Sequence, residues 1–362
     1  MRRIKELMMM NWRPQNWLRV SVAAGLTLLP AAGAPVQTNT PGWHMEYKKV
    51  ERASFTEEWN YAFPNYVSKR WFIALRYQPT TAWNRDVQCE AALLTSEGWK
   101  PFTLVHEGSR ERRLMLVIDY PHNDPLLKSG FKVKTTLTAT LYDQRLVSGD
   151  PVTPAATLNS DERQSYLVPT TTFDFGRDSV KDWITQHNLW KMKDEAPQDF
   201  VRRVYRELRK TLPFSGADGG PWICSQILKA GFGECARHAI VGTSILRANG
   251  IPARSISTLW AVDDTSQGAH CWGEFFWEGV GWVPYDTSLD QWNQSDAYFG
   301  YRKGLFIGES VDMDWVIYAG SMGWKTAFAI DAWPCYWAEG QGSFEGQKED
   351  HTTSVKIIER YQ

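Results

Sequence analysis

The order of hydrophobic and polar positions divides the chain into a β-rich first part and a second part with helical periodicity. From about Trp43 to Val168, runs of β-branched and aromatic residues alternate with turn-like stretches such as Pro121–Asp124. Their spacing predicts an antiparallel β-sandwich over residues 43–168, in which we find no catalytic constellation. The strands predicted within it are Lys69–Thr80, Val87–Thr95, Arg113–Tyr120 and Phe131–Tyr142.

Beyond a polar, proline-containing connector at residues 146–168, the hydrophobic period becomes that of helices. Phe200, Val204 and Leu208 recur at helical intervals, while charged residues occupy the opposite side of the same segment. This change of period predicts a domain boundary near residues 165–175, a second domain over residues 175–340 and a C-terminal tail over residues 341–362. Helices are expected at Asp178–Leu189, Pro197–Leu212 and Pro221–Ala230.

A further helix is expected to begin at Cys235. Gly231 and Gly233 precede it, an apolar face follows, and Gly250 supplies a C-terminal stop. A thiol in the first turn of a helix feels the partial positive charge of the unpaired N–H groups, which favours the thiolate. Cysteine is also a common buried apolar residue, so this feature alone does not identify a nucleophile.

A second informative stretch, Ala269–Ser288, has the pattern of a hairpin, with strands at residues 270–277 and 281–286. With the turn centred on residue 278, His270 lies directly opposite Asp286, and the two side chains share a face. A carboxylate in that place orients an imidazole and stabilises its protonated form. Cys235, His270 and Asp286, in this order, therefore match a thiol nucleophile, its base and the residue that orients the base.

Two runs of residues resemble the transglutaminase-like superfamily, whose fold is related to that of papain-type cysteine proteases. They are GECARHAIVGTSILRANGIPAR from Gly233 and HCWGEFFWEGVGWVPYD from His270, and the resemblance covers about residues 196–290. It implies a catalytic triad of Cys235, His270 and Asp286. It also implies an α+β papain/transglutaminase-like core, with the cysteine helix packed on an antiparallel sheet, as in secreted bacterial members that carry a β-rich segment ahead of the core. Residues 295–340 are expected to extend that sheet or to line the groove.

Other residues near the expected site leave alternatives open. Trp222 and Gln226 are candidates for an oxyanion donor besides the backbone N–H of Cys235. His238 lies on the cysteine helix without an orienting carboxylate, so we interpret it as a packed or capping residue. A zinc site would need His270 and Cys271 together, yet adjacent strand residues point to opposite faces. No calcium-binding pattern is visible either, so we expect neither metal nor cofactor.

Composition limits the partners. The chain has 43% hydrophobic and 22% charged residues and a formal net charge of −1, which is typical of a globular protein and does not favour nucleic acid or anionic membrane as a partner. The 19 tryptophans are expected mostly in cores, with a few lining a groove. The sequence does not indicate an oligomeric state.

Residues 1–34 have the pattern of a secretory signal peptide. A basic segment precedes the apolar run Val20–Leu29, and small residues follow at 31–34. The run is short and ends at Pro30, so we expect a secreted or periplasmic protein with no membrane span after cleavage; an uncleaved anchor is the alternative. Five cysteines in an oxidising compartment leave at least one free thiol. The other four, Cys89, Cys224, Cys271 and Cys335, could pair in three ways or stay reduced.

The predicted reaction is acyl transfer from an amide of a protein or peptide through a thioester on Cys235. Water as the acceptor makes a protease-like hydrolase, which we favour. An amine acceptor makes a protein-glutamine crosslinking transglutaminase, for which Trp260, Trp272 and Trp282 are available to form an apolar channel. The further alternatives are a peptide N-glycanase-like deglycosylase and a non-catalytic binding module on the same fold.

Overall fold

A computed structural model describes residues 42–76, 80–102, 115–149, 155–215, 221–262, 268–291, 295–312, 314–318, 322–328 and 334–361. The signal peptide predicted at residues 1–34 lies outside these ranges. The described residues form antiparallel sheets and helices, with a sheet-rich part ahead of a mixed core, which confirms the predicted α+β class. None of the helices in these ranges is long and apolar enough to cross a bilayer.

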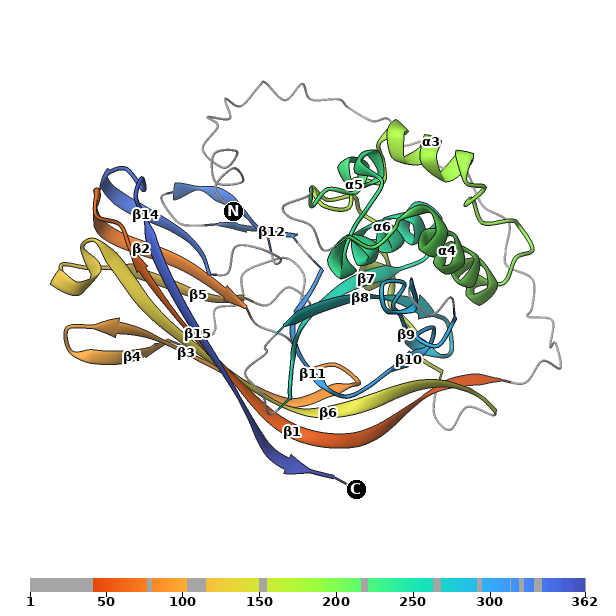
Figure 1. The fold of residues 1–362 in the computed structure, drawn as a ribbon, viewed down its shortest axis with the longest axis horizontal. Helices are drawn as coiled ribbons and strands as arrows, with labels where there is room; N and C mark the ends of the chain where they lie inside the picture. Colours follow the sequence, from red (N-terminus) through yellow and green to blue (C-terminus); the bar gives the residue numbers. More distant parts are fainter. Residues whose placement is uncertain are drawn as a thin grey trace.

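Two long, curved strands form the centre of the first sheet (Figure 1). They are β1 (Trp43–Ala62) and β6 (Gly130–Ser148), which pair along almost their whole length. Side chains on β1 alternate between buried and more exposed, as expected for a strand with one face on a core. The remaining strands of this sheet are β3 (Asn84–Thr95), β4 (Gly98–Phe102), β15 (Lys348–Arg360) and, on β6, the short β10 (Tyr301–Arg302).

A second sheet, in the order β14-β2-β5, lies between the first sheet and the helices. Its central strand carries the apolar run Trp71–Leu75, which is buried on both faces. Trp71, Ile73 and Leu75 pack in a cluster with the first sheet, whereas Phe72 and Ala74 join the core that contains the helices. A continuous apolar run is what a strand covered on both sides requires. The strands are β2 (Tyr66–Arg76), β5 (Met115–Pro121) and β14 (Cys335–Gly342).

The core combines helices with a sheet in the order β11-β7-β8-β9 (Figure 1). Helix α6 is buried from Ala236 to Arg247 and packs on β7 and β8, as predicted for the cysteine helix. Helix α6 spans Cys235–Ala248 and contacts α4 (Pro197–Thr211) and α5 (Cys224–Ala230), and α5 in turn contacts α3 (Asp178–Gln186). The strands are β7 (Ala253–Trp260), β8 (Ala269–Trp277), β9 (Gly281–Tyr285) and β11 (Phe306–Val311). Smaller elements are α2 (Ser160–Ser165), the hairpin of β12 (Asp314–Tyr318) and β13 (Trp324–Phe328), and 3-10 turns at Pro125–Leu127 and Leu289–Gln291.

The C-terminal residues depart from the predicted tail at 341–362, and that prediction is wrong. Strand β15 pairs with β1 from Glu51 to Ala62, and its Val355 and Ile357 pack on a cluster that contains Ala53 and Phe55. The segment looks like a tail in sequence because charged residues and threonines fill its solvent-facing positions, as is common in edge strands. Residues 295–340 were expected to extend the core sheet. Among the described residues of that range, β11 does so, whereas β10 and β14 join β6 and β2.

Two adjacent isoleucines test whether β15 is structural. Ile357 faces the cluster behind β1, whereas Ile358 is 48% exposed. Ile357→Ser should lower the free energy of unfolding by about 1–2 kcal/mol, because a partly buried aliphatic side chain is lost. Ile358→Ser is the matched control and should change it by less than about 0.5 kcal/mol. Urea titration measures both, and equal small effects would mean that residues 348–360 do not support the fold.

Candidate active site

The local sequence places Cys235 at the first position of α6. Glu234 is the N-cap, and its side chain accepts a hydrogen bond from the backbone N–H of Arg237. The Arg237 guanidinium returns to the Glu234 carboxylate and also donates to the carbonyl of Pro221 at 3.2 Å. Gly233 is required beside this pair, since a Cβ there would lie 2.6 Å from the Cβ of Arg237. The backbone N–H groups of the first turn, including that of Cys235, have no partner within the helix.

The hairpin of β8 and β9 brings His270 and Asp286 together, but in a different register from the one predicted. The ladder is centred on Gly279, with Gly273 opposite Tyr285, so the prediction that His270 lies directly opposite Asp286 is wrong. The ladder is shifted by two positions, which keeps both side chains on one face as diagonal neighbours. His270 Nε2 lies 2.6 Å from Asp286 Oδ2.

Asp286 is buried and surrounded by donors. Its Oδ1 accepts hydrogen bonds from the hydroxyl of Ser288 at 2.7 Å and from the backbone N–H groups of Ser288 and Leu289, both at 3.1 Å. Its Oδ2 accepts from His270 and, at 2.7 Å, from Nη1 of Arg302. Burial by itself raises the pKa of this carboxyl, but the charges and hydrogen bonds of His270 and Arg302 hold the pKa far below its usual range. Asp286 is therefore an anion in the folded protein.

The pKa values of His270 and Cys235 move in opposite directions. Burial lowers the pKa of His270, but the charge and hydrogen bond of Asp286 and a hydrogen bond with Cys235 raise it to about 9. A hydrogen bond from the thiol of Cys271, followed by the hydrogen bond and charge of His270, lowers the pKa of Cys235 well below its usual value despite burial. Because Nε2 is bonded to Asp286, Nδ1 is left for the sulfur. The favoured state at neutral pH is a thiolate paired with an imidazolium.

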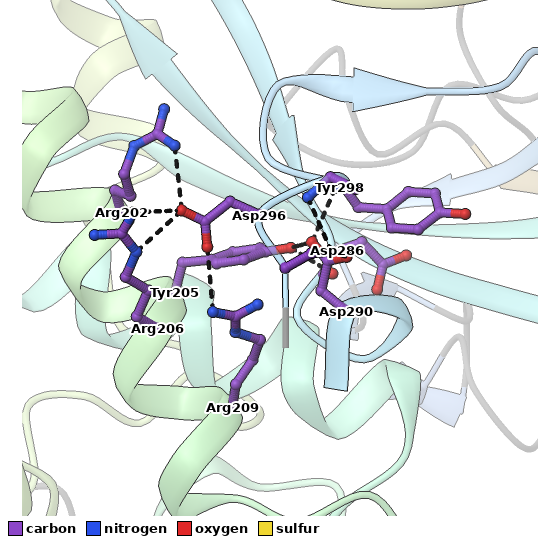
Figure 2. Close-up of polar contacts among 10 residues, drawn as sticks. Arg202, Tyr205, Arg206, Arg209, Asp286, Asp290, Asp296 and Tyr298 are labelled. Carbon is purple, nitrogen blue, oxygen red and sulfur yellow. Dashed lines mark hydrogen bonds and ion pairs between the residues drawn. The ribbon is translucent and has the colours of Figure 1, made fainter. Parts of the chain in front are cut away.

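The loop after Asp286 is fastened to α4 (Figure 2). The hydroxyl of Tyr205 donates to the backbone carbonyl of Asp286 at 3.1 Å and to the carboxylate of Asp290, which also accepts from the backbone N–H of Tyr298. Further along the loop, one carboxylate takes three cations from α4: Asp296 binds Arg202, Arg206 and Arg209. These contacts fasten the backbone at Asp286 and the loop that follows it to α4.

Sequence reasoning missed the residues that hold Asp286. A signal for Ser288 exists, because Asp-x-Ser is a common local turn pattern in which the carboxylate accepts from the residue two positions on. Arg302 has no such signal, because pairing of β10 with a strand far away in the sequence brings it to the site. Tyr205 lies on the apolar face from which α4 is predicted, so the sequence indicates only a core residue at this position.

The other candidate residues lie in different surroundings. His238 is buried, its Nδ1 lies 2.8 Å from the hydroxyl of Thr287, and burial lowers its pKa to about 4, so it is neutral. Trp222 stacks on Arg237, and Gln226 is exposed on α5. No disulfide joins any of the five cysteines, all of which lie in the described ranges. Within the described ranges no group of three or more His, Cys, Asp and Glu side chains has the arrangement of a metal site.

The tryptophans expected to form a channel are dispersed. Trp260 is partly exposed, and its ring lies 6.3 Å from that of His270. Trp272 also lies near His270 but is 2% exposed. Trp282 packs between other aromatic rings under Arg254, whose guanidinium lies 4.0 Å from the indole. Only Trp260 therefore combines exposure with proximity to His270 among these three.

Known proteins resemble this chain in part of its sequence and in its fold. Residues 189–287 match the model of the transglutaminase-like superfamily. A comparison with curated proteins finds no match. Among solved structures, a candidate cysteine protease from Cytophaga hutchinsonii is similar over 87% of this chain and 93% of its own, with a TM-score of 0.51 and 12% identity, and so supports the fold. The periplasmic domain of TgpA from Pseudomonas aeruginosa has a TM-score of 0.33 and 12% identity, covering 72% of this chain and 96% of its own. Red sea bream transglutaminase has a TM-score of 0.26 and 15% identity, covering 60% of this chain and 48% of its own.

Alkylation tests the ion pair without a substrate. At neutral pH, iodoacetate should modify Cys235 well before Cys89, because burial raises the pKa of Cys89 to about 12. The rate should fall as the pH rises through about 9, because deprotonation of His270 removes the positive charge that attracts the anionic reagent. Peptide mass spectrometry at a series of pH values measures both thiols.

The control variant for this experiment is His270→Gln. Without the imidazolium the thiol loses its counter-ion, and the rate at pH 7 should fall by about tenfold or more. Cys235 labelling no faster than Cys89 in the unmodified protein would show that Cys235 is an ordinary buried thiol.

Proposed function

We propose, from the match of residues 189–287 to the model of the transglutaminase-like superfamily, that the chain is a cysteine enzyme that breaks amide bonds of proteins or peptides through a thioester. One observation carries the proposal. His270 is hydrogen-bonded through Nε2 to the buried anion of Asp286, while it also forms a hydrogen bond with Cys235 at the start of α6. Such a linear arrangement of thiolate, imidazolium and carboxylate can both attack an acyl group and deliver a proton.

In the first half of the proposed reaction, the Cys235 thiolate attacks the carbon of the substrate carbonyl. The charge that develops on the carbonyl oxygen is stabilised by the backbone N–H of Cys235 and by the positive end of α6. The imidazolium of His270 then gives its Nδ1 proton to the leaving nitrogen, and the C–N bond breaks. An amine leaves, the acyl group stays on sulfur as a thioester, and His270 becomes neutral.

In the second half, neutral His270 takes a proton from water while the water oxygen attacks the thioester carbon. The C–S bond breaks, the acid leaves, and the thiolate–imidazolium pair is restored. Asp286 stays ionised throughout, because its four further hydrogen bonds do not depend on the charge of His270. Its role is to orient the imidazole and to stabilise its cationic form.

We favour water over an amine as the acceptor. An amine acceptor needs a path that excludes water, and of the three tryptophans considered for it, Trp272 is buried and Trp282 packs elsewhere. The partly exposed Trp260 remains as one wall beside His270. The export predicted from residues 1–34 would place this activity outside the cytoplasm, on secreted or periplasmic proteins or peptides.

Product analysis distinguishes the acceptors. Casein incubated with the protein and a labelled primary amine should yield new peptide termini without incorporation of label, and Cys235→Ala should abolish them. Incorporation that is lost in Cys235→Ala would instead identify a crosslinking transglutaminase. If neither product forms while Cys235 is still alkylated rapidly, the substrate is a different amide, such as that of a glycoprotein.

Replacement of the orienting carboxylate gives a second test. Asp286→Asn should lower the rate of cleavage by about 100-fold or more, because the imidazole loses its orienting anion. It should also move the fall in iodoacetate reactivity to a pH below about 9, because the carboxylate charge that raises the pKa of His270 is gone. The matched control is Asp296→Asn, which removes a carboxylate from the same loop at its contact with α4. Equal rates in the two variants would contradict the role given to Asp286.

A further inference from the structure

Arg302 is a fully buried cation beside the catalytic candidates. It is 1% exposed, and its Nη1 donates to the same carboxylate oxygen, Oδ2 of Asp286, that accepts from His270. Its guanidinium lies 4.3 Å from the ring of Trp272 and 4.4 Å from that of Phe306. Both rings are also neighbours of the His270 imidazole. The aromatic rings therefore fix the plane of the guanidinium while its charge is directed at Asp286.

Stability alone does not explain a cation in this place. Among the described residues, Nε and Nη2 of Arg302 have no hydrogen-bond partner. Burial lowers the pKa of the guanidinium against the effect of Asp286, which shows how strongly the site disfavours the charge. A buried ion pair with unmet donors often contributes less to folding than apolar residues of the same size. The reason for a buried cation at this position therefore lies in its effect on the Asp286 carboxylate.

The first sheet determines where Arg302 stands. Strand β10 pairs with β6, with Arg302 opposite Gln144, and the backbone N–H of Gly304 donates to the Asp143 carboxylate at 2.7 Å. Gly300, which precedes β10, is held on both sides, because its N–H donates to Pro284 of the hairpin and its carbonyl accepts from Leu146 of β6. The strand that carries Arg302 is thus fastened between the first sheet and the hairpin that bears Asp286.

We propose that Arg302 is a positioning residue through which the sheet-rich part of the chain sets the orientation and proton affinity of the His270–Asp286 pair. The proposal rests on the proposed function. Arg302 locks the carboxylate in the orientation that faces Nε2, and its positive charge opposes protonation of His270. The imidazolium is thereby kept acidic enough to give up its proton to the leaving group.

The charged and titratable groups around the guanidinium define what a change of pH can affect. Those that act on it are Asp286, Tyr298 and Cys235, and Arg302 in turn acts on His270. On the side of β6 its partner Gln144 is uncharged, while Asp143 and Arg145 influence the neighbouring Tyr301. Between neutral pH and about 9, therefore, His270 is the group whose titration Arg302 should shift.

Arg302→Met tests the proposal through the pH dependence of Cys235 alkylation by iodoacetate. Removal of the cation should move the fall in rate from about pH 9 upward by about one pH unit, opposite to the shift expected for Asp286→Asn. Casein cleavage should fall by about tenfold or more through kcat, with KM little changed. The midpoint of urea unfolding should fall, because the buried anion of Asp286 loses one donor, so the alkylation profile and not stability is the diagnostic readout. Arg302→Lys, which keeps the charge, should restore the alkylation profile of the unmodified protein.

The matched control is Arg247→Met. Arg247 is also buried and paired with an aspartate, Asp312, but it donates to the carbonyl of Ala253 and, among the described residues, forms no hydrogen bond or ion pair with His270 or Asp286. This variant should lower the urea midpoint and leave the alkylation profile unchanged. An unshifted profile in Arg302→Met, or the same shift in Arg247→Met, would overturn the proposal.

Two further outcomes separate the proposal from its premise. Should Arg302→Met fail to fold, Arg302→Gln removes the charge with a polar replacement and should show the same upward shift; failure of both neutral variants to fold would assign Arg302 to stability and overturn the proposal. The proposed function fails separately, when Cys235 of the unmodified protein is not alkylated faster than Cys89. If Cys235 of the unmodified protein is alkylated rapidly and Arg302→Met shows the same pH profile, the proposed enzymatic function is retained and only the role of Arg302 is rejected.

Discussion

Asp286 is a carboxylate that has been taken out of water and must remain charged, and much of the molecule is arranged to meet that requirement. An isolated buried anion is too costly to survive, so donors have to be supplied from several directions. His270 comes from β8, Arg302 from β10, and Ser288 and Leu289 from the turn that follows. Tyr205 of α4 fixes the backbone of the same residue. A substitution that moves any of these donors therefore affects the Cys235 thiol through the position and charge of Asp286.

The sheet-rich part consequently shares hydrophobic packing with the core and contributes to the structure of the site. Strand β2 is buried on both faces, so that Trp71 belongs to the first hydrophobic cluster and Phe72 to the core of the helices. The ring of Trp83, which directly precedes β3 of the first sheet, lies 5.2 Å from that of Trp272 on the strand that bears His270. The part of the sequence without catalytic candidates thus surrounds the side of the hairpin that carries them. Its contribution is rigidity and charge placement, for which no catalytic side chain is needed.

Local patterns in the sequence predict the features that depend on local geometry. The start of α6 follows from the glycines before Cys235, and the shared face of His270 and Asp286 follows from alternation along a hairpin, which survives an error of two positions in register. Features that depend on pairing between distant segments are missed. Arg302 reaches the site only because β10 pairs with β6, and β15 looks like a polar tail until Val355 and Ile357 are placed against β1. Hydrophobic periodicity predicts that a segment forms a strand, but it does not predict which other strand it pairs with.

The pairing of β1 with β15 has a consequence for how the chain acquires its structure. Glu51 stands opposite Arg360, and Ala62 opposite Lys348, so the first and last described strands close the sheet together. Contacts between segments this far apart in sequence form late and slow the folding of a chain. Until β15 pairs with β1, the apolar cluster around Ala53 and Phe55 lacks Val355 and Ile357 and has an uncovered edge. The first sheet, whose strand β6 also holds β10 and Arg302, is therefore complete only once residues 348–360 have joined β1.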